Sequence, residues 1–198
     1  MKKLMILAIV ALASLTASAQ QEVGTWSVTP KVGFNLATVT DTDAGMKFGV
    51  VTGADLTYQL QKKFAISAGA FYSMQGAKDK ENGVTSTMKL DYINVPILAN
   101  FYVIPGLAIK AGIQPGFLLS LKGKGSMKIN GQWVDQDTSS TDGTEKFDLS
   151  IPMGLSYEFS DFVIDARYNL GLTNVNKASD AKAKNAVIML TLGYKINL

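Results

Sequence analysis

Ionisable side chains recur at alternate positions in apolar stretches of this chain, a spacing that places them together on one face of a strand. Arg167 is the only arginine, and Asp165 lies two positions before it on the same face. A planar guanidinium can bind two carboxylates at once, so this pair can anchor an ion network. The charged residues expected to point inward are Lys31, Lys47, Asp55, Lys110, Asp148, Glu158, Asp165, Arg167 and Lys195.

Two kinds of chemistry are open to these charges. An ion path or a binding site would use them to conduct or to hold a ligand, whereas a polar plug would use carboxylates to neutralise Arg167 across neighbouring strands. We favour the plug, because small barrels fill their interior with side chains. Asp165 and Glu158 are the expected partners of Arg167, with Asp55 a further candidate. The expected lumen network is Arg167, Asp165, Glu158, Asp148, Asp55 and Lys110.

The residue types that most catalytic and metal sites need are missing. With no His and no Cys in the sequence, the usual general base, the commonest metal ligand and any disulfide are absent, and a serine nucleophile lacks its histidine. Segment 135–145 resembles a calcium loop, but Ser140 replaces the required glycine and Lys146 the required glutamate. Segment 123–126 lacks the spacing of a phosphate loop. We therefore expect no enzyme activity, no cofactor and no metal.

Strands of alternating polarity must position these charges. In 161–175 every even position from Phe162 to Leu172 is apolar, while Asp165, Arg167 and Asn169 occupy odd positions. This is the two-residue period of a strand, and a helix would need apolar residues three and four apart. The other segments that alternate in this way are 26–38, 46–60, 64–76, 87–103, 107–121, 147–160 and 186–198.

One of these segments changes phase. In 87–103 the apolar residues Met88, Leu90 and Tyr92 lie at even positions, whereas those from Ile93 to Val103 lie at odd positions. The change predicts a bulge, or a strand that passes above the membrane at this point.

The connections between the eight strands alternate in length, and no helix separates them. Short turns are expected at 61–63, 104–106 and 160–161, so the longer connections all fall at the opposite end. An even number of long strands with alternating loop lengths is the pattern of a membrane barrel. Only a closed barrel satisfies every backbone polar group in lipid without helices. The sequence therefore predicts an all-β fold, an eight-stranded antiparallel up-and-down transmembrane β-barrel.

The first residues predict export from the cytoplasm. Lys2 and Lys3 precede an apolar run of about a dozen residues and the A-x-A cleavage pattern Ala17-Ser18-Ala19. That run is shorter than the roughly 20 residues that a spanning helix needs. We expect a cleavable signal peptide over 1–19 and one barrel domain over 20–198. Loss of two lysines lowers a formal charge that is only +3, so nucleic acid is not an expected partner.

A soluble lipocalin-like barrel would show the same alternation with its apolar face inside. A polar face rich in Gly, Ser, Asn and Thr suits a narrow barrel interior instead, and the long loops share one end. We expect the outer membrane of a Gram-negative bacterium, with the long loops extracellular and the short turns and C-terminus periplasmic. Aromatic residues near the short turns and the chain end fit an interfacial girdle; they are Tyr58, Phe64, Phe101, Phe159, Phe162 and Tyr194.

Three stretches resemble a known family. Leu90–Ser120 resembles the Y-x-x-x-P strand pair of PorT-like outer-membrane β-barrel proteins. Asp165–Val175 is similar to that family's R-Y-x-x-G-L-x-[ND] penultimate strand, and the terminal LGYKINL is similar to its closing strand, which more often ends in Phe. The resemblance covers nearly the whole chain after the signal. It implies a barrel in the outer membrane and almost nothing about mechanism.

We expect a non-enzymatic outer-membrane barrel whose surface loops bind a partner, or whose body supports envelope structure or secretion. The alternative is a small channel or ligand-uptake barrel that uses the charged lumen. The expected partners are outer-membrane lipid and an envelope protein. Trp133, a large aromatic residue in an exposed loop, is a candidate for surface contact, and packing onto neighbouring loops explains it equally well.

Overall fold

The computed structural model describes residues 22–40, 45–81, 84–129, 132–138, 146–174 and 183–198. The expected signal peptide lies outside these residues. Within them, no helix is long and apolar enough to cross a membrane. The strands are β1 (Trp26–Val39), β2 (Gly45–Gln61), β3 (Phe64–Glu81), β4 (Val84–Asn94), β5 (Ile97–Ile104), β6 (Leu107–Ile129), β7 (Gln132–Thr138), β8 (Phe147–Phe159), β9 (Phe162–Gly171), β10 (Asn185–Tyr194) and β11 (Ile196–Asn197).

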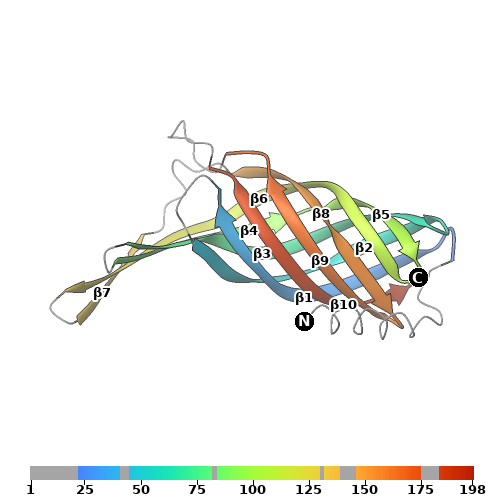
Figure 1. The fold of residues 1–198 in the computed structure, drawn as a ribbon, viewed down its shortest axis with the longest axis horizontal. Helices are drawn as coiled ribbons and strands as arrows, with labels where there is room; N and C mark the ends of the chain where they lie inside the picture. Colours follow the sequence, from blue (N-terminus) through green and yellow to red (C-terminus); the bar gives the residue numbers. More distant parts are fainter. Residues whose placement is uncertain (1–21, 41–44, 82–83, 130–131, 139–145, 175–182) are drawn as a thin grey trace, which may run out of the picture.

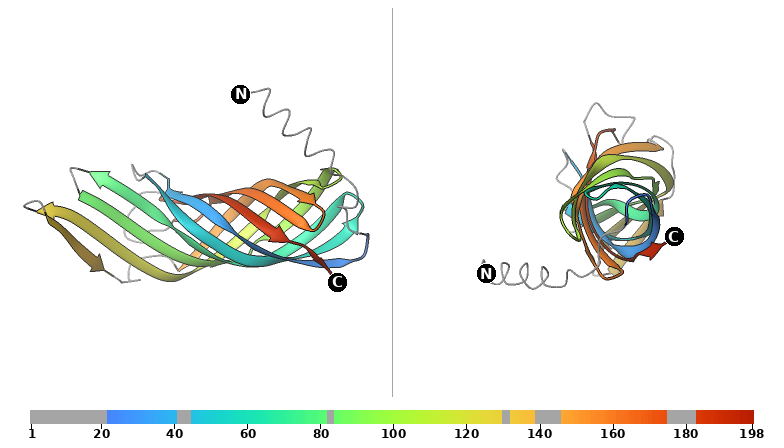
Figure 2. Two further views of the ribbon diagram at one scale, coloured as in Figure 1. Left: turned by 90° about the horizontal axis from the view of Figure 1, so that it is seen from below. Right: turned by 90° about the vertical axis from the view of Figure 1, so that its right-hand side faces the viewer.

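These strands close into an antiparallel ring of eight (Figure 1). Each wall strand pairs with the next one around the ring, and β1 closes the ring by pairing with β10, as in Phe34 opposite Leu190. β4 and β5 are two halves of one wall strand, separated by Val95 and Pro96, because proline has no N–H to give to a ladder. β10 and β11 form the last wall strand. The end-on view in Figure 2 shows the closed ring, which confirms the predicted fold.

The two faces of the wall are opposite to those of a soluble protein. In β9, Val163, Asp165, Arg167 and Asn169 are at most 4 % exposed, whereas the residues between them are exposed. The exposed outer surface carries the large apolar side chains of every wall strand, Ile164 among them. Such a surface is stable only in a lipid environment, so the membrane barrel and not the soluble one accounts for the sequence pattern.

Aromatic rings bound the apolar surface at both ends. At the loop end Phe34 stacks on Phe48 and Phe117 meets Phe147 edge-on, each with ring centres 5.7 Å apart. At the turn end lie the ring pairs Trp26–Tyr58, Phe159–Phe162 and Phe162–Tyr194. On β8, Phe147 and Phe159 mark the two levels. At roughly 3.3 Å per residue and a strand tilt of about 40°, they lie about 30 Å apart along the membrane normal, close to the hydrocarbon thickness of a bilayer.

The predicted short turns are two residues long. Lys62-Lys63, Pro105-Gly106 and Ser160-Asp161 join β2 to β3, β5 to β6 and β8 to β9. Gly106 and Ser160 have φ values of 81° and 51°, which tight antiparallel turns require.

The sheet rises well above the barrel on one side. The far ends of β3, β4 and β6 pair with one another, as in Lys80 opposite Thr85 and Thr85 opposite Ser126. β7 adds a fourth strand and pairs with β6 alone among the described residues. We call this four-stranded extension, residues 76–81, 84–89, 122–129 and 132–138, the loop-end sheet. In Figure 1 it projects beyond the ring, with β7 at its tip.

The phase change in 87–103 does not come from a bulge in that strand, which was one of its two predicted causes. β4 keeps its alternation throughout, because Leu90, Tyr92 and Asn94 all point inward and are at most 5 % exposed. The bulge lies in the facing strand β6, where the register shifts around Leu119. Leu90 and Tyr92 pack against Val39 and Ala77 and form an apolar layer inside the loop end of the lumen.

Candidate functional site

The lumen at mid-height holds a dense ion network, and a glycine in the wall leaves the space that this network needs. A Cβ on Gly69 of β3 would collide with the Asp55 carboxylate and would come within 2.7 Å of the Phe71 ring. Phe71 in turn lies beneath Arg167, whose guanidinium carbon is 5.6 Å from the ring centre. The glycine therefore lets an aromatic ring and a carboxylate share the same level of a narrow barrel.

Arg167 joins two carboxylates. Its Nε donates to Asp165 Oδ1 at 2.6 Å, and its Nη2 donates to Asp165 Oδ2 and Asp55 Oδ2 at 2.9 Å each. All three side chains are at most 3 % exposed. The sequence predicted that Arg167 binds two carboxylates. The two are Asp165, which was an expected partner, and Asp55, which was the further candidate.

Asp165 is the centre of the network. Its Oδ2 accepts hydrogen bonds at 2.9 Å from Lys31 Nζ and from Lys110 Nζ, in addition to the one from Arg167 Nη2. Lys31 also binds Asp55 Oδ2 at 2.7 Å. Three cations thus surround two carboxylates. We call Lys31, Asp55, Lys110, Asp165 and Arg167 the central network.

The central network joins walls that face each other. In the ring of eight, β1 and β6 lie four strands apart in either direction, and their residues Lys31 and Lys110 meet on the same oxygen of Asp165. β9 and β3 are likewise opposite, and Arg167 spans the gap between them to Phe71. The lumen is therefore crossed by side chains in two directions at this level.

A second, smaller group lies nearer the turn end. Glu158 Oε2 binds Lys195 Nζ at 2.7 Å, and Glu158 Oε1 accepts the Tyr102 hydroxyl at 2.7 Å. The expected pairing of Glu158 with Arg167 is therefore wrong. Gly154, and not Glu158, is the residue of β8 opposite Arg167, and Glu158 lies four residues further toward the turns.

The remaining inward charges lie toward the loop end and join neither group. Lys47 Nζ donates to the backbone oxygen of Gln75 at 2.8 Å. Asp148 Oδ1 accepts the Thr173 hydroxyl at 2.8 Å and has no ion pair among the described residues. All nine charged residues expected in the interior are at most 9 % exposed.

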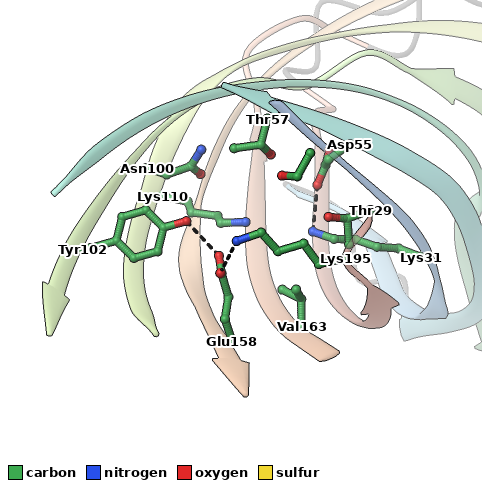
Figure 3. Close-up of a pocket in the computed structure, with 11 residues that line it drawn as sticks. Thr29, Lys31, Asp55, Thr57, Asn100, Tyr102, Lys110, Glu158, Val163 and Lys195 are labelled. Carbon is green, nitrogen blue, oxygen red and sulfur yellow. Dashed lines mark hydrogen bonds and ion pairs between the residues drawn. The ribbon is translucent and has the colours of Figure 1, made fainter. Parts of the chain in front are cut away.

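A small cavity separates the central network from the Glu158 group (Figure 3). Its volume is about 10 Å³, close to the least that holds one water molecule. Lys110, Asn100 and Tyr102 of one wall face Lys31 and Thr29 of the other across it. The site can hold water or a single small ion, and it has no space for an organic substrate.

Some of the polar atoms here were not foreseen from the sequence. Tyr102 and Phe71 were not among the residues expected at the site, although the period-two register of their strands places both inward. Trp133 belongs to β7, and its side chain lies outside the described residues. Arg167 Nη1 and Asp55 Oδ1 have no hydrogen-bond partner within the described part of the chain.

Comparison with known proteins agrees with this geometry. A family model described as "Outer membrane protein beta-barrel domain" matches residues 18–177. Among solved structures, Ail of Yersinia pestis in complex with the heparin analogue sucrose octasulfate is similar at 19% identity and a TM-score of 0.51, over 88% of this chain and 100% of that one. Neisserial surface protein A is similar at 13% identity and a TM-score of 0.52, over 86% and 97%. The comparison with curated proteins gives no match. With its matched residues, closed ring and lipid-facing apolar surface, the chain belongs to the outer membrane protein beta-barrel domain family of Gram-negative outer membranes.

Proposed function

We propose that this protein is a non-enzymatic outer-membrane barrel with a closed lumen, which holds an extracellular sheet that binds an envelope or surface partner. In this proposal the long-loop end faces outward, and the two-residue turns and the C-terminus face the periplasm. Outer-membrane barrels have short periplasmic turns and longer extracellular loops, which supports this orientation.

The observation that carries the closed lumen is the meeting of opposite walls on Asp165. Lys31 from β1 and Lys110 from β6 bind one of its oxygens at 2.9 Å each. An ion path at this level would require these contacts to separate. Separation would leave charges without partners in a region nearly free of water, which costs several kcal/mol.

The observation that supports partner binding is the loop-end sheet. In this proposal it extends a hydrogen-bonded sheet beyond the membrane, where a barrel with no role outside would need only short loops. Its last strand, β7, has one ladder partner among the described residues, so its other edge offers backbone N–H and C=O groups to a strand of another protein.

The alternative function, a small channel or uptake barrel, draws its support from the inward charges themselves. Buried ionisable residues mark ion pathways in many membrane proteins. Here, however, Lys31, Lys110 and Arg167 are all bound to carboxylates, and only a water-sized cavity lies between the two charged groups. The finer likeness to PorT-like proteins, carried by Leu90–Ser120 and Asp165–Val175, also remains part of this proposal, and it favours neither function over the other.

Two measurements test the proposal. In planar bilayers the purified protein is expected to show little steady conductance, and large, stable, ion-selective openings would make the channel the better reading. In intact cells, a photo-crosslinking residue at Gln136 of β7 is expected to capture one discrete envelope or surface protein. The same residue at Lys62, in a turn at the other end of the barrel, is the matched control. The partner-binding role is refuted if Gln136 captures nothing, or only the products captured at Lys62.

A further inference from the structure

Two lysines face each other on the outer surface of the loop-end sheet. Lys89 of β4 and Lys122 of β6 are direct cross-strand partners. Their neighbours Leu90 and Leu121 point into the barrel and pack in its apolar layer, so the two lysines point outward, and Lys122 is exposed. Like charges that face each other directly across a ladder destabilise a sheet. The pair therefore needs an anionic partner, or it weakens the strands that hold it.

A third lysine joins this pair. Lys78 of β3 lies opposite Thr87, two residues from Lys89, which makes it a diagonal neighbour at roughly 7–8 Å. It is exposed and points outward, since the adjacent Ala77 is buried in the lumen. We call Lys78, Lys89 and Lys122 the lysine triad.

No carboxylate of the described residues forms an ion pair with the lysine triad. The acidic position nearest to it on the same strand face is Asp91, which lies two residues toward the membrane from Lys89. On the other side, the register places Asp137 of β7 opposite Lys124, which is not a member of the triad. Three cations on one sheet face thus lack a partner within the part of the chain that the structure describes.

The height of the triad indicates what the partner is. The lipid-facing apolar surface ends at Ile93 on β4 and at Leu119 on β6, which is 56 % exposed. Lys89 lies four residues beyond Ile93, or about 10 Å higher along the membrane normal. The polar headgroup layer extends roughly 5–7 Å beyond the hydrocarbon on each side, and a flexible lysine stem reaches back over several ångströms. The ammonium groups therefore meet the headgroup layer from the side.

We propose that the lysine triad binds phosphate groups of the glycolipid in the outer leaflet, of the lipid A kind. A phosphate between the facing ammonium groups of Lys89 and Lys122 turns their repulsion into two charge-assisted hydrogen bonds. Lys78 widens the site along the membrane plane, so that a second phosphate of the same lipid has a cation to meet. The inference rests on the proposed orientation of the loop end, and it is independent of any protein partner.

The test uses the full folded barrel in nanodiscs of phosphatidylcholine that contain lipid A in both leaflets, so its result does not depend on the orientation in the cell. The lipid A that stays on the protein after transfer into detergent is counted by native mass spectrometry. Near a membrane surface each lysine contributes about fivefold to binding of an anionic lipid. The variant Lys78→Gln/Lys89→Gln/Lys122→Gln is expected to retain lipid A about a hundredfold more weakly. The gel shift of the unboiled barrel verifies that the variant is folded.

The matched control is Lys62→Gln/Lys63→Gln, which removes two exposed lysines at the opposite end and should retain lipid A as the parent does. Lipid A from which the phosphates have been removed should be retained weakly, and to the same extent, by the parent, the triad variant and the control variant. The inference would be overturned if the triad variant retained as much lipid A as the parent does. It would also be overturned if the parent retained phosphate-free lipid A as strongly as intact lipid A. If the control loses as much as the triad variant, net charge alone explains binding. If sucrose octasulfate binds the detergent-solubilised parent through the triad and lipid A does not, the surface recognises soluble sulfated glycans and the lipid assignment is wrong.

Discussion

Replacement of Asp165 by Asn is the sharpest test of the lumen network. The side chain keeps its shape and one oxygen, but Lys31, Lys110 and Arg167 then face Asp55 as their only carboxylate. Removal of one partner from a buried ion pair costs on the order of 3–5 kcal/mol. Since Asp165 binds all three cations, we expect Asp165→Asn to lie at the upper end, about 5 kcal/mol of unfolding free energy.

Arg167→Met should cost less, although it removes the larger side chain. It leaves Lys31 and Lys110 facing Asp55 and Asp165, two cations for two carboxylates, and Lys31 still binds Asp55 at 2.7 Å. The remaining loss is that of three charge-assisted hydrogen bonds, partly offset by relief of the excess positive charge. We expect about 2–4 kcal/mol.

The assay is urea unfolding in lipid vesicles, followed by tryptophan fluorescence and by the gel shift of the unboiled barrel. The double variant Asp165→Asn/Lys110→Met restores the parent's excess of one positive charge, and it should recover at least 1 kcal/mol relative to Asp165→Asn. If Asp165→Asn unfolds within about 0.5 kcal/mol of the parent, or if Arg167→Met is the more damaging of the two, the network does not hold the lumen together as described.

Three further outcomes are expected in the same assay. Arg167→Lys should fall between the parent and Arg167→Met, because an ammonium cannot bind two carboxylates in the geometry of the fork; stability equal to that of Arg167→Met would show that the remaining charge contributes nothing. Lys195→Met should cost about 1–3 kcal/mol, since it leaves Glu158 with only a neutral hydrogen bond. The double variant Lys195→Met/Glu158→Gln should recover part of this loss, and a loss equal to the sum of the two single losses would contradict the pairing. Gly69→Ala should destabilise by about 1–3 kcal/mol, because its methyl group would strike the Asp55 carboxylate, and a neutral result would mean that the wall yields at that point.

Much of the fold followed from the two-residue period, because a closed barrel leaves each side chain only two destinations. The same period placed Asp165 and Arg167 together on the inner face of β9. The period says nothing about which side chains meet across the lumen. Those distances depend on how far each strand is shifted against the next around the ring. Asp55 meets Arg167 because of that shift, while Glu158, on a strand adjacent to Arg167, comes to lie too near the turns to reach it.

The apolar layer at the loop end was beyond sequence reasoning for another reason. Leu90 and Tyr92 have the hydropathy of lipid-facing residues, and hydropathy does not distinguish a side chain in lipid from one packed in a dry lumen. Only the contacts with Val39 and Ala77 from other strands identify the side on which they lie. The phase change did carry information. It marks the level at which the side chains that fill the lumen change from polar to apolar, and not a bulge in the strand.

The separation in sequence between members of the central network has a consequence for how the barrel enters the membrane. Lys31 and Asp55 lie 24 residues apart on neighbouring strands, and Asp165 and Arg167 only two apart, so each end of the chain can neutralise its own charges as soon as a hairpin forms. The contacts between the ends span 112 and 134 residues, and such distant contacts form late. A nascent hairpin can thus approach lipid with its charges at this level already paired. Lys110, on the central strand β6, forms an ion pair with β9 and with no other strand among the described residues. Insertion of that strand should therefore wait for β9 to arrive, which couples entry into the bilayer to closure of the ring.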